Sequence, residues 1–244
     1  MNMKKKHRKK LQITLIGILL CGIGGIGYYQ EDVIHWIQSL QPVASYDMTS
    51  IPNYSGDSYV VINENQPDFN EEDMMTTSFE SYSDQDVLGR SGIAFANIGK
   101  DLMPTEERGS IGMIKPTGWH TVKYDIVDGK YLYNRCHLIG YQLTGENANE
   151  KNLITCTRSM NTEGMLPFEN QVAEYIEKTG NHVLYRVTPV YKDRNLLASG
   201  VQIEAKSVED NGEGVCFNVY VYNVQEGIEI DYRTGESQLL SEAH

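Results

Sequence analysis

The longest apolar stretch of the chain runs from Leu11 to Tyr29 and contains no charged residue. At 1.5 Å per residue, a helix over this stretch is about 29 Å long, close to the hydrocarbon thickness of a bilayer. Residues 4–10, which precede it, are nearly all basic, and a basic flank stays in the cytoplasm. We therefore predict a cytoplasmic segment at 1–10 and a single-pass transmembrane signal anchor at 11–29, with every later residue outside the cell.

Two other interpretations of this stretch place the protein differently. A cleaved signal peptide would release a secreted protein, but no clear small-x-small cleavage site follows the apolar run. Cys21 raises the possibility of a lipoprotein, although Leu20 stands where a lipobox has a small residue. The membrane-anchored form is the one we favour, with secretion after cleavage as the alternative.

Strand patterns are strongest near the C-terminus. Val183–Val190, Gly200–Ala205 and Val215–Val224 alternate in polarity or are rich in β-branched and aromatic residues, which predicts three strands. Asn211-Gly212 is a typical turn between the last two. Much earlier in the chain, Ser58–Asn63 has the pattern of a further short strand.

One helix is well marked, between Pro167 and Lys178. Pro167 suits the first helical turn, and Gly180 is placed to end the helix. Glu169 falls on the same helical stripe as the apolar residues that follow it, so its carboxylate should point inward. An inward carboxylate requires a partner such as a metal-bound water or an arginine. The alternative is a helix-start glutamate that only complements the helix dipole.

These elements predict an α+β fold with a mixed or antiparallel central sheet and flanking helices. The chain is long enough to bury a core as one domain with appendages. We place a stalk at 30–50, the folded domain at 51–235 and a C-terminal tail at 236–244.

The charge balance limits which partners the domain can bind tightly. Residues 30–244 carry 15 basic against 33 acidic residues, a net charge of −18. Non-specific nucleic-acid binding usually relies on a basic surface. An acidic domain can still cut nucleic acid when a divalent cation and a few arginines neutralise the phosphate under attack. Such an enzyme would bind weakly and turn over, and the acidity is equally consistent with a plain secreted domain.

Three cysteines lie beyond the anchor: Cys136, Cys156 and Cys216. Three thiols cannot all pair within one chain, and the sequence leaves their connectivity open. No CxxC motif combines with histidines, which argues against a structural zinc site.

The segment from Tyr131 to Tyr175 holds the candidate chemistry. His137 can accept a proton from water near neutral pH, and an amide oxygen such as that of Asn161 can bind a hard cation. Arg135 and Arg158 can each form paired hydrogen bonds to phosphate oxygens. Taken singly, these residues fit a structural histidine, a loop asparagine and ion-pairing arginines. Their combination indicates hydrolysis of phosphodiester bonds.

The same segment resembles the family of DNA/RNA non-specific endonucleases with a ββα-metal core, especially its membrane-anchored and secreted streptococcal members. The family signature is Asp-Arg-Gly-His, followed by an asparagine metal ligand and then a glutamate. This chain has Asn134-Arg135-Cys136-His137, then Asn161 and Glu169, so it departs from the signature at Asn134 and Cys136. The resemblance extends over residues 50–232.

The resemblance implies a mechanism and assigns each residue a role in it. His137 is the general base, Arg135 is catalytic, and Glu169 orients the waters of a Mg²⁺ ion held by Asn161. Mn²⁺ is the expected substitute for Mg²⁺. The implied phosphate contacts come from Arg158, Arg108 and Asn134. The expected substrate is DNA, with RNA a further family expectation, contacted through the phosphate backbone with little sequence preference and cut to leave 5′ phosphates. No organic cofactor is expected.

Two rival functions remain open from the sequence. One is a catalytically weak or inactive surface protein of the same fold that binds nucleic acid or a protein partner, which the net charge and altered signature favour. The other is a cell-wall or peptide hydrolase that uses Cys136 with His137. Neighbouring residues on a strand point to opposite faces, which makes that dyad awkward.

Overall fold

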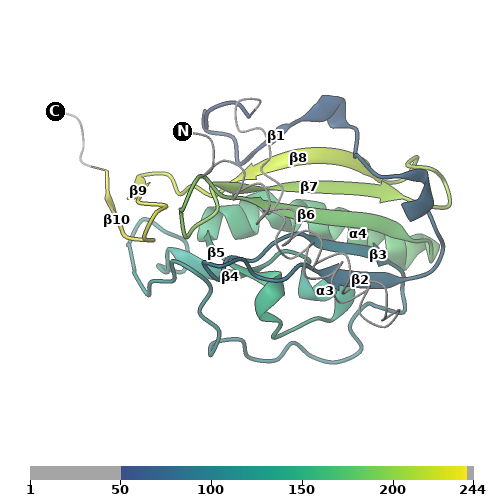
Figure 1. Cartoon of the computed structure of the whole chain (residues 1–244), viewed down its shortest axis with the longest axis horizontal. Coiled ribbons are helices and arrows are strands. Elements are labelled where there is room, and N and C mark those ends of the chain that lie inside the picture. The colour runs from purple at the N-terminus through teal and green to yellow at the C-terminus, as the bar shows by residue number, and fades with distance from the viewer. Residues whose placement is uncertain (1–50, 241–244) are drawn as a thin grey trace, which may run out of the picture. The chain divides into compact units, whose positions relative to one another are not determined.

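A six-stranded sheet forms the body of the domain (Figure 1), and every pairing within it is antiparallel. The computed structural model describes residues 51–240, so the predicted basic segment, anchor and stalk lie outside the described residues. Within 51–240, no helix is both long and apolar enough to cross a bilayer. In sheet order the strands are β1 (Tyr59–Val61), β8 (Cys216–Tyr222), β7 (Gly200–Ser207), β6 (Val183–Val190), β3 (Ala94–Ile98) and β2 (Phe79–Tyr82).

Two smaller antiparallel pairs accompany the sheet. The first is β4 (Tyr133–His137) with β5 (Leu153–Thr157), and the second is β9 (Ile228–Ile230) with β10 (Ser237–Leu239). Strand β10 begins within the segment that we expected to be a tail, so strand pairing continues past residue 235.

Within residues 51–240, the longest helix is α4 (Leu166–Thr179), which follows directly on a π-helical turn at Met160–Met165. The same range contains one further α-helix, the short α3 (Tyr141–Thr144). Three 3₁₀ turns complete the described elements, at Asn63–Asn65, Glu71–Asp73 and Glu150–Asn152.

The strongest sequence patterns correspond closely to elements of the structure. Strand β6 has the predicted bounds, and the predicted turn holds Asn211 and Gly212 at φ of 54° and 93°. Helix α4 ends at Gly180, whose φ of 74° is left-handed and therefore suits glycine. Strands β2 and β3 were not predicted, because β3 fills its core positions with small alanines that give little hydrophobic signal.

The main core lies between one face of the sheet and a layer made of α4 and the β4–β5 hairpin. In Figure 1, α4 runs behind β6 and β7. Its Val172, Ala173 and Ile176 are buried in the same cluster as Tyr185 of β6 and Cys136 of β4. The inward stripe predicted for this helix is therefore confirmed, and it packs the hairpin and the helix start against the same support.

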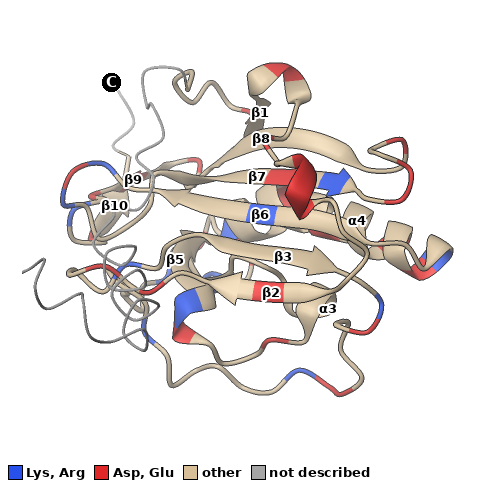
Figure 2. Ribbon diagram, turned by 45° about the vertical axis from the view of Figure 1, so that its right-hand side comes forward, with Lys and Arg blue, Asp and Glu red and all other residues tan. Residues whose placement is uncertain are grey.

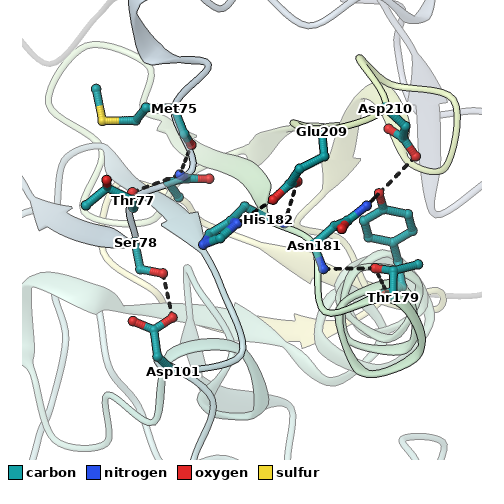
Figure 3. Close-up of polar contacts among 11 residues, drawn as sticks. Met75, Thr77, Ser78, Asp101, Thr179, Asn181, His182, Glu209 and Asp210 are labelled. Atoms are coloured by element: carbon teal, nitrogen blue, oxygen red, sulfur yellow. Dashed lines mark hydrogen bonds and ion pairs between the residues drawn. The ribbon is translucent and has the colours of Figure 1, made fainter.

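A polar cluster joins the loops at one end of the sheet, where β2 and β6 begin and β3 and β7 end (Figure 3). His182 Nδ1 lies 2.7 Å from Glu209 Oε1, and Glu209 Oε2 accepts a hydrogen bond from the backbone N–H of His182. Beside them, the Ser78 hydroxyl donates to Asp101 over 2.6 Å. Each contact joins residues distant in sequence, so the cluster fastens the sheet end.

Candidate active site

A cleft of about 570 Å³ opens beside β4, the π-helical turn and the first turn of α4. The seven side chains that the sequence singled out all line it, and they come from four separate parts of the chain. They are Arg108, Asn134, Arg135, His137, Arg158, Asn161 and Glu169. Folding thus brings the predicted set together, which is the geometric condition for a shared site.

His137 lies at the end of β4 and is only 5% exposed. Its Nε2 lies 2.7 Å from the Asn147 carbonyl oxygen, which can only accept, so Nε2 carries the proton and Nδ1 keeps its lone pair. Burial lowers the pKa of His137 below its ordinary 6.5, and the nearby Arg108 guanidinium lowers the pKa further. The ring is therefore neutral at pH 7, with one nitrogen able to accept a proton.

Arg108 lies directly against that nitrogen, with its Nη2 3.3 Å from His137 Nδ1. The guanidinium can only donate, so it points a hydrogen toward the lone pair that a base would use. This places a positive charge where an anionic phosphate would lie during attack. Arg108 belongs to the long connection between β3 and β4, which includes little regular structure.

Asn161 lies in the π-helical turn, a rare geometry that is frequent at functional sites. Its Oδ1 is 3.2 Å from Cys136 Sγ, but that sulfur is bonded to Cys156 and has no proton to donate. No N–H or O–H group within residues 51–240 donates to this amide oxygen. It remains available as a ligand for a hard cation, which prefers oxygen.

The donor set fits a sparsely ligated divalent cation. Within residues 51–240, no three His, Cys, Asp or Glu side chains gather as metal ligands. The side chains that line the cleft instead offer the amide oxygens of Asn134 and Asn161, the Glu169 carboxylate and several hydroxyl groups. A Mg²⁺ ion keeps several of its waters and needs few protein ligands, so the side chains present fit such an ion.

Glu169 extends from the first turn of α4 toward Gly140, at the start of α3. A methyl group at position 140 would overlap the Glu169 carboxylate, so glycine is required for this close approach. Desolvation raises the pKa of Glu169 to about 7, against the opposing effects of a Gln142 hydrogen bond and of Arg108. The carboxylate is thus ready to exchange a proton near neutral pH or to be stabilised by a cation.

The remaining polar side chains of the cleft are partly committed to the protein. Arg135 donates to the backbone carbonyls of Gly112 and Ile114 and lies 3.9 Å from the ring centroid of Trp119. Arg158 donates twice to Asp128. The Nδ2 atom of Asn134, in contrast, is buried without a partner among the described residues.

A family model described as DNA/RNA non-specific endonuclease matches residues 70–209, more than half of the chain. The chain belongs to this family. It is therefore a nuclease, a hydrolase of phosphodiester bonds, and the matched range contains every side chain of the cleft discussed above.

Solved structures agree with the family assignment. The endonuclease superposes on NucA from Streptococcus agalactiae with magnesium bound, at a TM-score of 0.69 and 24% identity over 86% of this chain and 98% of that one. The metal-free form of NucA gives a TM-score of 0.68 and 25% identity over 88% of this chain and 99% of that one. Sda1 nuclease with bound zinc gives a TM-score of 0.63 and 25% identity over 78% of this chain and 100% of that one. The sheet, the β4–β5 hairpin and α4 of the endonuclease therefore match the ββα-metal nuclease architecture.

The disulfide removes one rival chemistry from the endonuclease. Cys136 and Cys156 are bonded across β4 and β5, and Cys216 is free. Cys136 therefore has no thiolate with which to attack a peptide or wall polymer.

Two contributors to the endonuclease site were missed in the sequence. The Asn147 carbonyl sets the tautomer of His137, and Gly140 admits the Glu169 carboxylate. A backbone carbonyl gives no side-chain signal, and the spacing of asparagines around Asn147 was the only available sign.

Proposed function

We propose that the endonuclease is metal-dependent and cuts DNA without sequence preference outside the cell, with His137 as general base and Asn161 as the side chain that holds Mg²⁺. The observation that supports this most directly is the shared cleft, where a neutral imidazole with an unprotonated Nδ1 lies near an uncommitted amide oxygen. Both groups are needed for water to attack a phosphodiester.

Each residue acts through the geometry described above. His137 Nδ1 takes the proton of the attacking water, while the Asn147 carbonyl holds the ring. Arg108 moves from the imidazole to the phosphate, where its charge is stabilised by the substrate. Arg135, Arg158 and Asn134 line the phosphate path, although Arg135 and Arg158 must exchange or share their present acceptors.

The bound cation would be held by the Asn161 oxygen and by waters that the Glu169 carboxylate orients. When bound it would supply positive charge at the phosphate and at the leaving oxygen. Magnesium is the ion we propose, since NucA was solved with it, and Mn²⁺ should substitute. A zinc ion in Sda1 supports a divalent site more generally.

The proposed cellular location is inferred from the sequence pattern at the N-terminus. We propose that residues 11–29 anchor the protein in the cell membrane with residues 1–10 in the cytoplasm, which places the nuclease domain outside, and that RNA is cut as well as DNA. The basic flank and the uncharged apolar run support the anchor. Release by cleavage is the alternative.

A plasmid-nicking assay tests the proposal. The domain should convert supercoiled plasmid to nicked and linear forms in Mg²⁺, lose this activity in excess EDTA and recover it with Mg²⁺ or Mn²⁺. Asn161→Ala should raise the Mg²⁺ concentration for half-maximal cutting. Full activity in excess chelator would overturn the metal-dependent mechanism.

A catalytically weak protein of the same fold, which only binds nucleic acid or a partner, is favoured by two observations. The net charge beyond the anchor is −18, and Figure 2 shows basic and acidic positions interspersed, with largely uncharged strands. Two cleft arginines also have acceptors within the protein. If this reading holds, DNA will be retained in a gel-shift assay while plasmid stays uncut in Mg²⁺.

A further inference from the structure

The cleft continues beyond the proposed catalytic groups to Tyr131. Tyr131 lines the same cleft as His137, yet 48% of its surface is exposed. It lies just before β4, six positions ahead of His137, so the two residues are at most about 20 Å apart along the chain. A nucleic-acid strand that places a phosphate at His137 would therefore reach Tyr131 within a few nucleotides.

One cation lies against this aromatic ring, and a second lines the same cleft. Lys123 pairs with Tyr131 in an isolated β-bridge, and its Nζ lies 4.4 Å from the centre of the tyrosine ring. Arg158 lines the cleft, and its present partner Asp128 has a side chain that is 78% exposed. An ion pair this exposed is weak in water, so a phosphate can compete for the guanidinium.

An exposed aromatic ring next to cations is the usual surface for single-stranded nucleic acid, because every nucleobase has a face that can stack and every linkage carries a charge. A duplex does not offer the same contact, because its bases are already stacked on one another. Lys123 lies over one face of the Tyr131 ring, so a nucleobase would stack on the other face of this exposed side chain.

We propose that Tyr131 is a stacking platform for a nucleobase of single-stranded nucleic acid, with Lys123 and Arg158 contacting the neighbouring phosphates. This proposal rests on the proposed nuclease function. The platform adds affinity for strands with unpaired bases to a cleft that otherwise contacts only phosphates. The endonuclease should therefore bind single strands more tightly than duplexes of the same length.

The test compares cleavage of one labelled oligonucleotide in three forms: single-stranded, single-stranded with base-free residues in place of most nucleotides, and duplex. Tyr131→Ala should raise KM for the single strand about tenfold, the loss expected for one stacked base, and leave kcat and the duplex KM near the parent values. Tyr131→Phe should behave like the parent, because it keeps the ring. Base-free residues should raise the parent KM and add nothing to Tyr131→Ala.

Tyr54→Ala is the matched control, because Tyr54 is 40% exposed and does not line the cleft. It should retain the parent KM on every substrate. The platform would be overturned if Tyr131→Ala had the same KM as the parent on the single strand. It would also be overturned if the substitution raised KM equally on the single strand and on the duplex.

Failure of the nuclease proposal is a separate result. If the parent protein cuts none of the three substrates in Mg²⁺, fluorescence anisotropy with the same oligonucleotides measures the platform by binding alone. Weaker binding of the single strand by Tyr131→Ala would then support the platform, and unchanged binding would reject it.

Discussion

Two histidines of this endonuclease lie in contrasting surroundings. His137, in the cleft, donates to a backbone carbonyl and faces the Arg108 guanidinium through its other nitrogen. His182, at the sheet end, has the Glu209 carboxylate 2.7 Å from its Nδ1, and its backbone N–H donates a second hydrogen bond to the same carboxylate. The first arrangement leaves a lone pair facing a cation, and the second uses the imidazole to fasten two loops.

The comparison shows that the partners of a histidine, and not the residue type, distinguish a candidate catalytic histidine from a structural one. A neutral carbonyl holds the His137 ring without adding charge, and the neighbouring cation disfavours a protonated ring. At the sheet end, the Glu209 carboxyl is raised in pKa by burial but lowered overall by its hydrogen bonds to His182. A hydrogen-bonded pair that joins two loops serves folding, whereas a base must remain free to change its proton.

The largest expected effect comes from removing each imidazole in turn. His137→Ala should lower plasmid cutting by about 10³-fold, because it removes the general base. His182→Ala should lower Tm and leave kcat near the parent value. Cutting rates and thermal melts of the two variants check this contrast, and a His137→Ala protein that cuts at the parent rate would exclude His137 as the base.

Two glycines allow a matched test of the surroundings. Gly140→Ala should displace the Glu169 carboxylate and lower kcat by about 10²-fold, because small misplacements at a reacting centre are costly. Gly99→Ala would instead crowd Ser78, Asp101 and His182, so it should lower Tm and spare kcat. Gly140→Ala should have no further effect in a Glu169→Ala background, and an additive loss there would show that Gly140 acts elsewhere.

Glu169→Gln should lower activity and raise the stability of the folded domain, and the gain in stability should depend on pH. The folded-state pKa of Glu169 is about 7, above its ordinary 4.5, so the folded state holds the proton more tightly and the parent loses stability as pH rises from 4.5 to 7. In EDTA the variant should be more stable than the parent by about 2 kcal/mol at pH 8, with no such gain at pH 4.5. Denaturant unfolding at both pH values measures the free energies of unfolding. If the variant and the parent differ by the same amount at pH 8 and at pH 4.5, the Glu169 carboxyl is not desolvated as proposed.

The smallest expected effect is on the His137 pKa itself. Arg108→Ala removes a cation that lowers this pKa, so the pKa should rise toward 6.5. The imidazole would then lose its proton at a higher pH, moving the acid limb of the activity profile upward. NMR titration of the imidazole reports the value directly, and Arg233→Ala, outside the cleft, should leave it unchanged.

Much of the site was predictable because residue type alone limits chemistry. An imidazole, an amide and a carboxylate on the core-facing stripe of a helix indicated hydrolysis before any fold was known, and all three line one cleft. Helix α4 and strands β6, β7 and β8 were predictable because their signals are local, in side-chain period and in turn residues. The roles of the individual site residues remain predictions.

Contacts between distant parts of the chain could not be predicted. The sequence by itself determined which chemical groups were available, where the periodic elements lay, and that the N-terminal segment has the pattern of an anchor. Only the tertiary structure decided that Asn147 sets the His137 tautomer, that Arg108 faces Nδ1, that Cys136 pairs with Cys156, and that Tyr131 shares the cleft. The physical reason is that side-chain period and turn preference act over a few residues, whereas proton affinity and ligand access depend on neighbours that packing brings in from elsewhere.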